Sequence, residues 1–352
     1  MYAIGPGANG GAAETVLYNF TGNPNGANPV GDLTLDDAGN LYGATENGGL
    51  NNAGTVFELS PPSSPGGAWA ETVLYSFNPA DNVSDGVPQA GLVFDSAGNL
   101  YGTASGSQGG SSCSDRNFCG EVFELSPPSQ PGGAWAQTVL HLFTTLIGSD
   151  GAIPIAPVTF DKAGNLYGTT YDGGLFGGGT VFKLTPSSIP GAPWTSTVLV
   201  SFYFNEGDGP LAGLTASPGG RSFFGTTSDG GTFSGGTVFE VSPSASPGGP
   251  WEFGVVHYFG ARGDGYAPQG RLALGSGVLY GTTIMGGARQ AGSVFQISES
   301  AGKAVETVLY SFTGGNDGNG PAAGVMVLNG SLYGTTVGGG YTGYGTVFQL
   351  SY

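Results

Sequence analysis

The sequence predicts an all-β protein with the fold of a six-bladed β-propeller, four antiparallel strands to each blade. Two observations carry this prediction: the composition and a six-fold internal repeat. The 352 residues include 70 Gly and 23 Pro and only 9% are charged, yet 39% are hydrophobic and 12% are aromatic. This composition is typical of many short strands joined by Gly-rich turns, with enough apolar side chains to form a core.

The clearest repeated element is the segment Glu-Thr-Val-Leu-Tyr-Ser-Phe at residues 71–77. Related segments occupy residues 14–20, 137–143, 196–202, 253–259 and 306–312. Self-similarity of this kind is the signature of a repeat architecture. We take this segment as the outermost strand of a blade. Its Val, Tyr and Phe are expected on one face and its Leu on the other, which suits a blade packed between two neighbours.

Three further segments keep step with the outer strand. We expect an apolar run at residues 90–95 as the innermost strand, Asn-Leu-Tyr-Gly-Thr-Thr at residues 165–170 as the second and Gly-Thr-Val-Phe-Glu-Leu-Ser at residues 54–60 as the third. Their Val, Phe, Tyr and Thr content and their Gly, Asn, Asp or Pro boundaries are strand and turn signals. Four strands in six copies predict a single domain over residues 1–352. Its blades are expected at about residues 29–77, 88–143, 154–202, 210–259, 268–312 and 321–351.

The phase of the repeat predicts how the ring closes. After an N-terminal extension of residues 1–13, the chain begins with a lone outermost strand at residues 14–20. The last blade, residues 321–351, has only its first three strands. We expect the N-terminal strand to complete this C-terminal blade, which would remove a free sheet edge.

The repeated Gly-Asn-Leu-Tyr-Gly-Thr-Thr, then Gly-Gly, then Gly-Thr-Val-Phe-Glu-Leu resembles the GloVer tandem repeat of bacterial secreted and surface proteins. The resemblance extends from about residue 14 to residue 351. It implies an exported bacterial protein, often with a C-terminal sorting or anchoring signal, although this chain ends at Leu350-Ser351-Tyr352 without one. It implies no particular activity and no catalytic residues.

Charge and hydropathy exclude several classes of partner. With 25 acidic and 8 basic residues, the net charge is −17 at pH 7. Binding to nucleic acid, or to an anionic membrane surface, needs more Lys and Arg than the eight of this chain. No run of 18 apolar residues occurs, so no membrane span is expected.

The two cysteines indicate in which cellular compartment the protein is expected. Cys113 and Cys119 are separated by five residues in a Ser-rich segment, a gap that a disulfide can close. Free thiols and a metal site are the alternatives. A disulfide would indicate an oxidising compartment. Together with the scarcity of Lys, it favours an extracellular or cell-surface protein whose leader is absent from this chain.

An Asp-Gly pair precedes most of the innermost strands. These aspartates are Asp85, Asp150, Asp208 and Asp264, with a looser match at Asp317. They predict either Asx-type turns or a ring of carboxylates that binds Ca²⁺ or serves as paired glycosidase acids. The two histidines, His141 and His257, replace Tyr in the outermost strand, where acid–base chemistry is not expected.

The residues that break the repeat lie on loops of the face expected to bind ligands. Aromatic side chains suited to stacking on sugar rings are Tyr171, Phe176, Phe233, Tyr266, Tyr341 and Tyr344. Three arginines fall near the fifth blade: Arg262, Arg271 and Arg289. They predict either a site for a carboxylate or sulfate group, or local pairing with nearby acids.

These features favour an extracellular binding or scaffold module for a glycan or a protein partner, not an enzyme. One alternative is a lyase or hydrolase acting on polysaccharide, in which Tyr266 or Tyr280 beside Arg271 would serve as base. Another is a subunit of a self-assembling surface structure, because low charge and repeated geometry would allow lateral packing.

Overall fold

A computed structural model describes residues 1–6, 12–64, 66–78, 86–106, 119–130, 132–144, 148–189, 192–246, 248–300 and 303–351. Its secondary structure is β-strand, and no helix occurs in these ranges. The described part of the chain therefore holds no helix with the length and apolar character needed to cross a membrane. The predicted fold class is confirmed: the chain is an all-β protein of the six-bladed β-propeller class.

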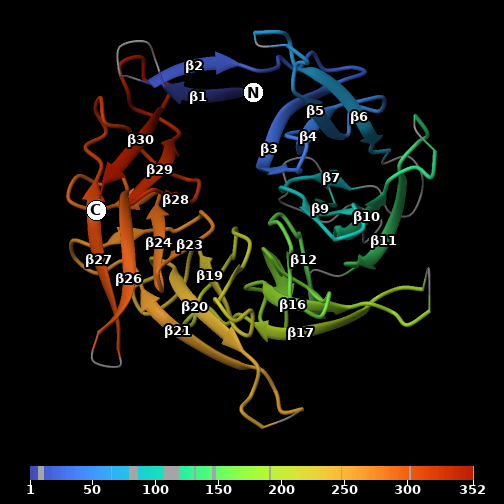
Figure 1. Ribbon diagram of the computed structural model, residues 1–352. Coiled ribbons are helices and arrows are strands. Elements are labelled where there is room, and N and C mark those ends of the chain that lie inside the picture. Colours follow the sequence, from blue (N-terminus) through green and yellow to red (C-terminus); the bar gives the residue numbers. More distant parts are fainter. Residues whose placement is uncertain are drawn as a thin grey trace. The chain divides into compact units, whose positions relative to one another are not determined.

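The chain divides into two compact units. Unit 1 comprises Met1–Thr144, Ile153–Val158 and Ser187–Trp194, and unit 2 comprises Thr145–Ala152, Thr159–Pro186 and Thr195–Tyr352. Figure 1 shows both, with the strands of unit 1 in blue to green and most of those of unit 2 in green to red. Each unit has its own sheets and its own hydrophobic clusters, and each is described by itself.

Unit 1 contains two blade sheets and a small N-terminal sheet. The first blade sheet is β3 (Gly26–Leu35), β4 (Leu41–Gly48), β5 (Thr55–Ser60) and β6 (Ala70–Ser76). The second is β7 (Val87–Pro88) and β8 (Val93–Phe94), which both pair with β9 (Leu100–Ser105), followed by β10 (Glu121–Ser126) and β11 (Ala136–Leu142). The small sheet is β1 (Tyr2–Pro6) paired with β2 (Ala12–Val16).

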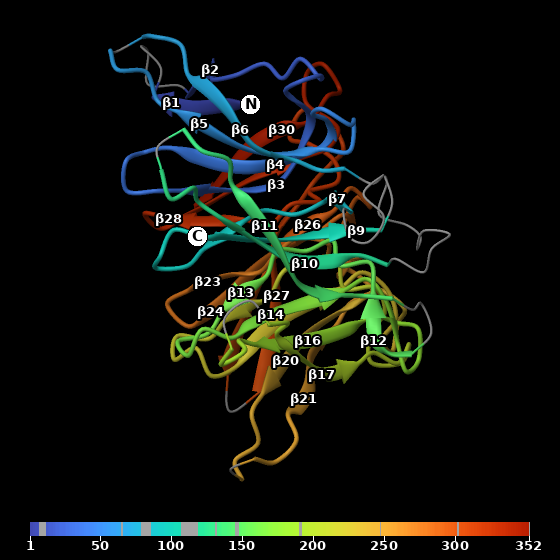
Figure 2. The same ribbon diagram turned by 90° about the vertical axis from the view of Figure 1, so that its right-hand side faces the viewer.

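Unit 2 contains four blade sheets and two short ribbons. Within each blade sheet the strands are given in spatial order. The first sheet is β13 (Thr159–Phe160), β14 (Leu166–Thr170), β16 (Thr180–Thr185) and β17 (Thr195–Ser201), and the second is β18 (Thr215–Ala216), β19 (Phe223–Thr227), β20 (Thr237–Ser242) and β21 (Glu252–Tyr258). The third is β23 (Ala273–Gly275), β24 (Val278–Thr283), β26 (Ser293–Ser300) and β27 (Lys303–Ser311), and the fourth is β28 (Met326–Leu328), β29 (Ser331–Thr336) and β30 (Thr346–Ser351). The ribbons are β12 (Gly148–Ala152) with β15 (Asp172–Gly174), and β22 (Gly265–Tyr266) with β25 (Met285–Gly286). Figure 2 shows β16 beside β17 and β20 beside β21, as antiparallel neighbours.

The N-terminal segment differs in detail from its prediction. The expected extension is not a loose tail, because Tyr2–Pro6 forms β1 and pairs with Ala12–Val16. The strand ends at Val16, short of the expected residue 20. Within the described residues the last sheet has three strands, β28, β29 and β30. The pairing of residues 14–20 with the last blade therefore stays a prediction.

The outermost strand carries a β-bulge in each four-stranded repeat, which changes the expected faces. In β6, Val73 pairs with Phe57 and Tyr75 pairs with the adjacent Val56, so Leu74 is the extra residue. The same shift occurs between Val238 and Phe239 in the pairing of β20 with β21. Because Phe57 and Val56 are neighbours on β5, Val73 and Tyr75 lie on opposite faces of the sheet, not on the same one. The bulge therefore lets the outer strand contact both neighbouring sheets.

One glycine is required by the core of every blade. The Gly of the second strand lies directly across from the Phe of the third, as with Gly225 and Phe239. A Cβ on Gly225 would lie 2.4 Å from Cζ of that ring, which is fully buried. The same pairing holds for Gly43, Gly102, Gly168, Gly281 and Gly334 with Phe57, Phe123, Phe182, Phe295 and Phe348. The Leu-Tyr-Gly-Thr-Thr motif thus makes room for the ring that the Thr-Val-Phe motif provides.

Local side-chain turns join the first strand to the second. The Asp161 carboxylate accepts hydrogen bonds from the backbone N–H of Ala163 and Asn165, from the Asn165 side-chain amide and from the Tyr167 hydroxyl, over 2.7–3.1 Å. Asp36 and Asp95 make the same set. Burial acts to raise the pKa of Asp161, but these hydrogen bonds outweigh it and hold the pKa below its usual value.

Candidate functional site

The loops between the second and third strands of the sheets in unit 2, here called the 2–3 loops, carry exposed apolar side chains. They span residues 171–179, 228–236, 284–292 and 337–345. The exposed side chains on them are Leu175, Phe176, Phe233, Met285, Val337, Tyr341 and Tyr344. The two tyrosines share one loop and are 97% and 91% exposed, so almost their whole rings face solvent.

Backbone hydrogen bonds between glycines close each 2–3 loop. The N–H of Gly345 donates to the carbonyl of Gly339 over 3.0 Å, and Gly236 donates in the same way to Gly230 over 3.1 Å. Both members of each pair have positive φ, a conformation open to glycine at little cost. The double glycines therefore build a clamp that holds the loop while its exposed side chains project outward.

The predicted aromatic residues divide into two groups. Phe176, Phe233, Tyr341 and Tyr344 are exposed, and the ring of Phe176 packs edge-on against Tyr203 at 5.5 Å. Tyr171 and Tyr266 are half-buried. A Cβ at Gly209 would lie 2.9 Å from the Tyr171 ring, so that tyrosine covers backbone and offers less of its face to a ligand.

The three predicted arginines have different surroundings. Arg262 and Arg289 are exposed, on loops at either side of the β22–β25 ribbon. Arg271 is half-buried and donates from Nη2 to Oγ1 of Thr159 on the innermost strand β13, over 3.3 Å. Arg271 is therefore tied to another blade sheet of unit 2, and the anion site predicted for the three arginines together stays a prediction.

The predicted aspartates do not form an equivalent set. Asp85 lies outside the described residues, and Asp150 is half-buried at the β12–β15 ribbon. Gly265, the residue after Asp264, lies against Thr283 of the second strand. In the preceding repeat the glycine that lies against the corresponding Thr227 is Gly207, not Gly209. The residue equivalent to Asp264 is therefore Glu206, which precedes Gly207. Asp208 instead pairs through its backbone with Asp229. Burial and the nearby Asp229 and Asp172 raise the pKa of Asp208.

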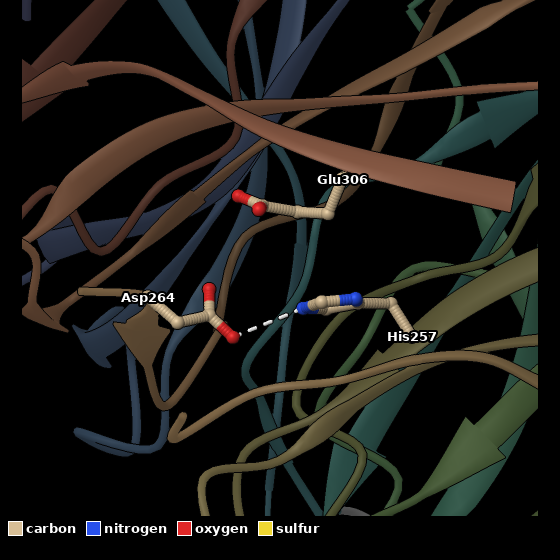
Figure 3. A group of neighbouring side chains, drawn as sticks. All are labelled: His257, Asp264 and Glu306. Carbon is tan, nitrogen blue, oxygen red and sulfur yellow. Dashed lines mark hydrogen bonds and ion pairs between the residues drawn. The ribbon is translucent and has the colours of Figure 1, made fainter. Parts of the chain in front are cut away.

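One predicted aspartate belongs to a cluster that the sequence did not reveal. His257 of β21, Asp264 of the following loop and Glu306 of β27 each present a ligand-type atom within 4.8 Å of the other two. Figure 3 shows the imidazole and both carboxylates converging, with His257 Nε2 3.0 Å from Asp264 Oδ2. All three side chains lie in unit 2, where β21 and β27 are the outermost strands of consecutive sheets.

The surroundings of this cluster are partly buried. The His257 side chain is 23% exposed and that of Asp264 is 8% exposed. Asp264 Oδ1 accepts a hydrogen bond from the N–H of Gly265 over 2.6 Å. Glu306 Oε1 is buried and has no hydrogen-bond partner. Burial and the negative charge of Asp264 raise the pKa of Glu306 to about 7, against a smaller opposing effect of His257.

The same three positions recur in unit 1 with different side chains. There the hydroxyl of Tyr18 donates to Glu71 Oε2 over 3.1 Å, and the amide of Asn25 donates both to that hydroxyl and to Glu71 Oε2. Tyr18 precedes Asn25 by seven residues, as His257 precedes Asp264. The shared spacing shows that the cluster occupies a regular inter-repeat position, which holds Tyr, Asn and Glu in unit 1 and His, Asp and Glu in unit 2.

This comparison shows what the sequence reasoning missed. The sequence pattern places His257 on the outer strand, where acid–base chemistry is not expected, and it does not single out Glu306. The available signal was the seven-residue spacing from the fifth residue of the outer strand to the Asx-Gly pair, which also joins Tyr310 to Asp317 by a 3.0 Å hydrogen bond.

Cys113 lies outside the described residues, so the predicted disulfide with Cys119 stays a prediction. Cys119 is buried, and its backbone N–H donates to the carbonyl of Phe143 over 2.8 Å.

Several solved structures resemble the chain. One, a protein from Bacteroides uniformis assigned as a 6-phosphogluconolactonase, has 14% identity and a TM-score of 0.56, covering 92% of this chain and 81% of its own. A protein from Thermus thermophilus assigned as an oxidoreductase (glucose dehydrogenase) has 17% identity and a TM-score of 0.51, covering 92% and 97%. A luciferin-regenerating enzyme has 14% identity and a TM-score of 0.50, covering 93% and 92%.

At such low identity these likenesses concern the fold alone. No curated protein matches the chain. The model of one family does match, over residues 2–220 and 190–352, which together span almost the whole sequence and include every repeat described above. The chain belongs to the Gloeobacter/Verrucomicrobia repeat family.

Proposed function

We propose that this protein is an extracellular binding module that uses the 2–3 loops of unit 2 to hold a glycan. The observation that carries the proposal is the pair Tyr341 and Tyr344, two almost fully exposed rings on one glycine-clamped loop. A soluble protein gains nothing for its own stability from such rings, whereas an exposed ring offers a flat apolar face to the C–H face of a sugar.

The construction of the loop supports binding. The Gly345–Gly339 clamp orders the backbone before any ligand arrives, so little loop entropy remains to be lost on association. Exposed apolar side chains at the same place in the other 2–3 loops, among them Phe176 and Phe233, would extend the contact along a chain of sugars.

Charge favours an uncharged glycan. The protein has a net charge of −17 at pH 7, which repels polyanions. Arg271 is already engaged by Thr159, so fewer guanidinium groups remain to bind a uronate or sulfate. We therefore expect neutral polysaccharides to bind better than acidic ones.

The test compares the wild-type chain with Tyr341→Ala/Tyr344→Ala on a glycan array and in affinity electrophoresis with neutral and acidic polysaccharides. We expect the wild type to bind a neutral class and the double variant to bind at least about fivefold more weakly, because each stacked ring contributes about 0.5–1.5 kcal/mol.

Ile189→Ala is the matched control. Ile189 is also an exposed apolar residue, 66% exposed, but it lies on the loop between the third and fourth strands, at the opposite end of the third strand from a 2–3 loop. Its replacement should leave binding unchanged. Absence of glycan binding by the wild type, or equal loss in both variants, would contradict the proposal. Release of reducing ends from a bound glycan would instead support the polysaccharide-acting enzyme.

A further inference from the structure

The group formed by His257, Asp264 and Glu306 has the composition of a metal site. It combines one imidazole with two carboxylates, and it is the one group of three such side chains within mutual reach in the described part of unit 2. Zn²⁺ is commonly bound by His and carboxylate ligands, with water as the fourth ligand where the protein provides three. Ca²⁺ prefers six to eight oxygen ligands, which this set does not resemble.

The distances suit a small ion. Ligand bonds of about 2.0–2.2 Å in a tetrahedral site place neighbouring ligand atoms roughly 3.4 Å apart. His257 Nε2 and Asp264 Oδ2 are 3.0 Å apart, and the three ligand atoms lie within 4.8 Å of one another. A change in the Glu306 side-chain torsions, with no backbone movement, would bring its carboxylate to the ion.

Neighbouring groups hold two of the three ligands in place. The N–H of Gly265 binds Asp264 Oδ1, which leaves Oδ2 directed at the imidazole. The His257 ring packs edge-on against Phe259 at 4.6 Å. Such supporting contacts orient ligands in metal sites and reduce the entropy lost when the ion binds.

The repeat in unit 1 has a different balance of hydrogen-bond donors and carboxylates. At the equivalent position, Tyr18 and Asn25 both donate hydrogen bonds to Glu71, so a single carboxylate has two neutral donors. Near His257 a second carboxylate stands in place of the amide. Glu306 Oε1 is buried without a partner, as Glu71 Oε1 is in unit 1, so the second carboxylate is what distinguishes the two repeats. Two partly buried carboxylates beside one imidazole favour a compensating positive charge, which a metal ion would supply.

From this geometry we propose that His257, Asp264 and Glu306 bind a divalent transition-metal ion, with Zn²⁺ the best fit. The ion would join the outer strands β21 and β27 of two consecutive sheets in unit 2. The Asp264 carbonyl accepts a hydrogen bond from the N–H of Gly287, on the 2–3 loop of residues 284–292, over 2.7 Å. The three ligand side chains include none of the exposed side chains of the 2–3 loops, so the metal proposal does not depend on the glycan proposal. The rival arrangement is a protonated imidazole that bridges the two carboxylates without a metal.

The experiment titrates the EDTA-stripped full chain with ZnCl₂ by isothermal calorimetry, and with Co²⁺ while its visible d–d bands are recorded. We expect one Zn²⁺ per chain, and Co²⁺ bands typical of a site with nitrogen and oxygen ligands. The affinity of Glu306→Gln should fall at least about tenfold.

Two further variants make the result decisive. His257→Tyr/Asp264→Asn rebuilds the Tyr–Asn–Glu set of unit 1, so it should remain folded, as judged by its thermal unfolding, and lose the ion. Glu71→Gln changes the equivalent glutamate in unit 1 and should leave Zn²⁺ binding unchanged. The proposal is overturned if the wild type binds no Zn²⁺ and shows no Co²⁺ bands, or if His257→Tyr/Asp264→Asn binds as much metal as the wild type.

Discussion

Replacement of Gly225 by Ala tests the pairing of glycine and phenylalanine that underlies every blade. The added Cβ would lie 2.4 Å from Cζ of Phe239 and 3.0 Å from Cδ2 of Leu214. Ordinary contact begins at 3.4 Å, so the ring would have to retreat by about 1 Å (3.4 − 2.4). Phe239 is fully buried in a cluster with Phe202 and Leu214, so no free space is left into which its ring could move. Overpacking of this kind costs about 1–3 kcal/mol, and we expect the upper end of that range.

Urea unfolding followed by tryptophan fluorescence measures the effect, with the free energy of unfolding compared between variants. Gly254→Ala is the matched control, because Gly254 lies on β21 of the same sheet and nothing lies within 4 Å of its added Cβ. It should change stability by no more than about 0.5 kcal/mol. Adding Phe239→Leu to Gly225→Ala should recover at least about 1 kcal/mol. Equal destabilisation by both alanine variants, or strict additivity in the double variant, would refute the reasoning.

Three further predictions follow from single contacts. In the metal-free folded protein the pKa of Glu306 is about 7, against 4.5 in the unfolded chain, so folding favours the protonated carboxyl. Its contribution to stability is therefore fully present below pH 4.5 and is lost as the pH rises through 7. Glu306→Gln should remove that loss and be more stable than the wild type by about 1–2 kcal/mol at pH 8.5, after allowance for solvent screening, in thermal melts with EDTA, whereas parallel pH profiles would contradict this. Asp161→Ala removes the acceptor of the turn that includes Asn165 and should cost about 2–3 kcal/mol in urea unfolding, with loss near zero counting against the turn. Thr227→Val deprives the buried Thr237 hydroxyl of its 2.9 Å partner and should cost about 1–3 kcal/mol by the same measurement; a neutral result would show that the pair is dispensable.

The sequence by itself determined the fold class, because the information needed is local. Each strand motif lies within about seven residues, each turn motif within five, and both are repeated in step along the chain. The Asp-x-Ala-Gly-Asn turn at Asp161 closes through hydrogen bonds between residues no more than six apart. The role of the glycine in Leu-Tyr-Gly-Thr-Thr can also be predicted once the second and third strands are paired, because their register places this glycine across from the Phe of the third strand.

The bulge in the outer strand could not be predicted from alternation alone. One extra residue at Leu74 moves Tyr75 to the other face. The seven-residue segment is equally consistent with a regular strand that has no bulge. The β1–β2 pairing was missed for a similar reason, because residues 1–6 carry no copy of the repeat.

Only the tertiary structure decided which side chains meet across sheets. His257 and Glu306 are far apart in sequence, on strands of different sheets, and their approach depends on the bulge and on how closely the two sheets pack. The sequence singled out Asp264 as a candidate metal ligand, but it did not indicate that His257 and Glu306 lie beside it, and Asp208 is offset by two residues from the repeat position of Asp264. The Asp-Gly motif reports only the local backbone around Asp264, whereas its contacts with His257 and Glu306 depend on how the two sheets pack.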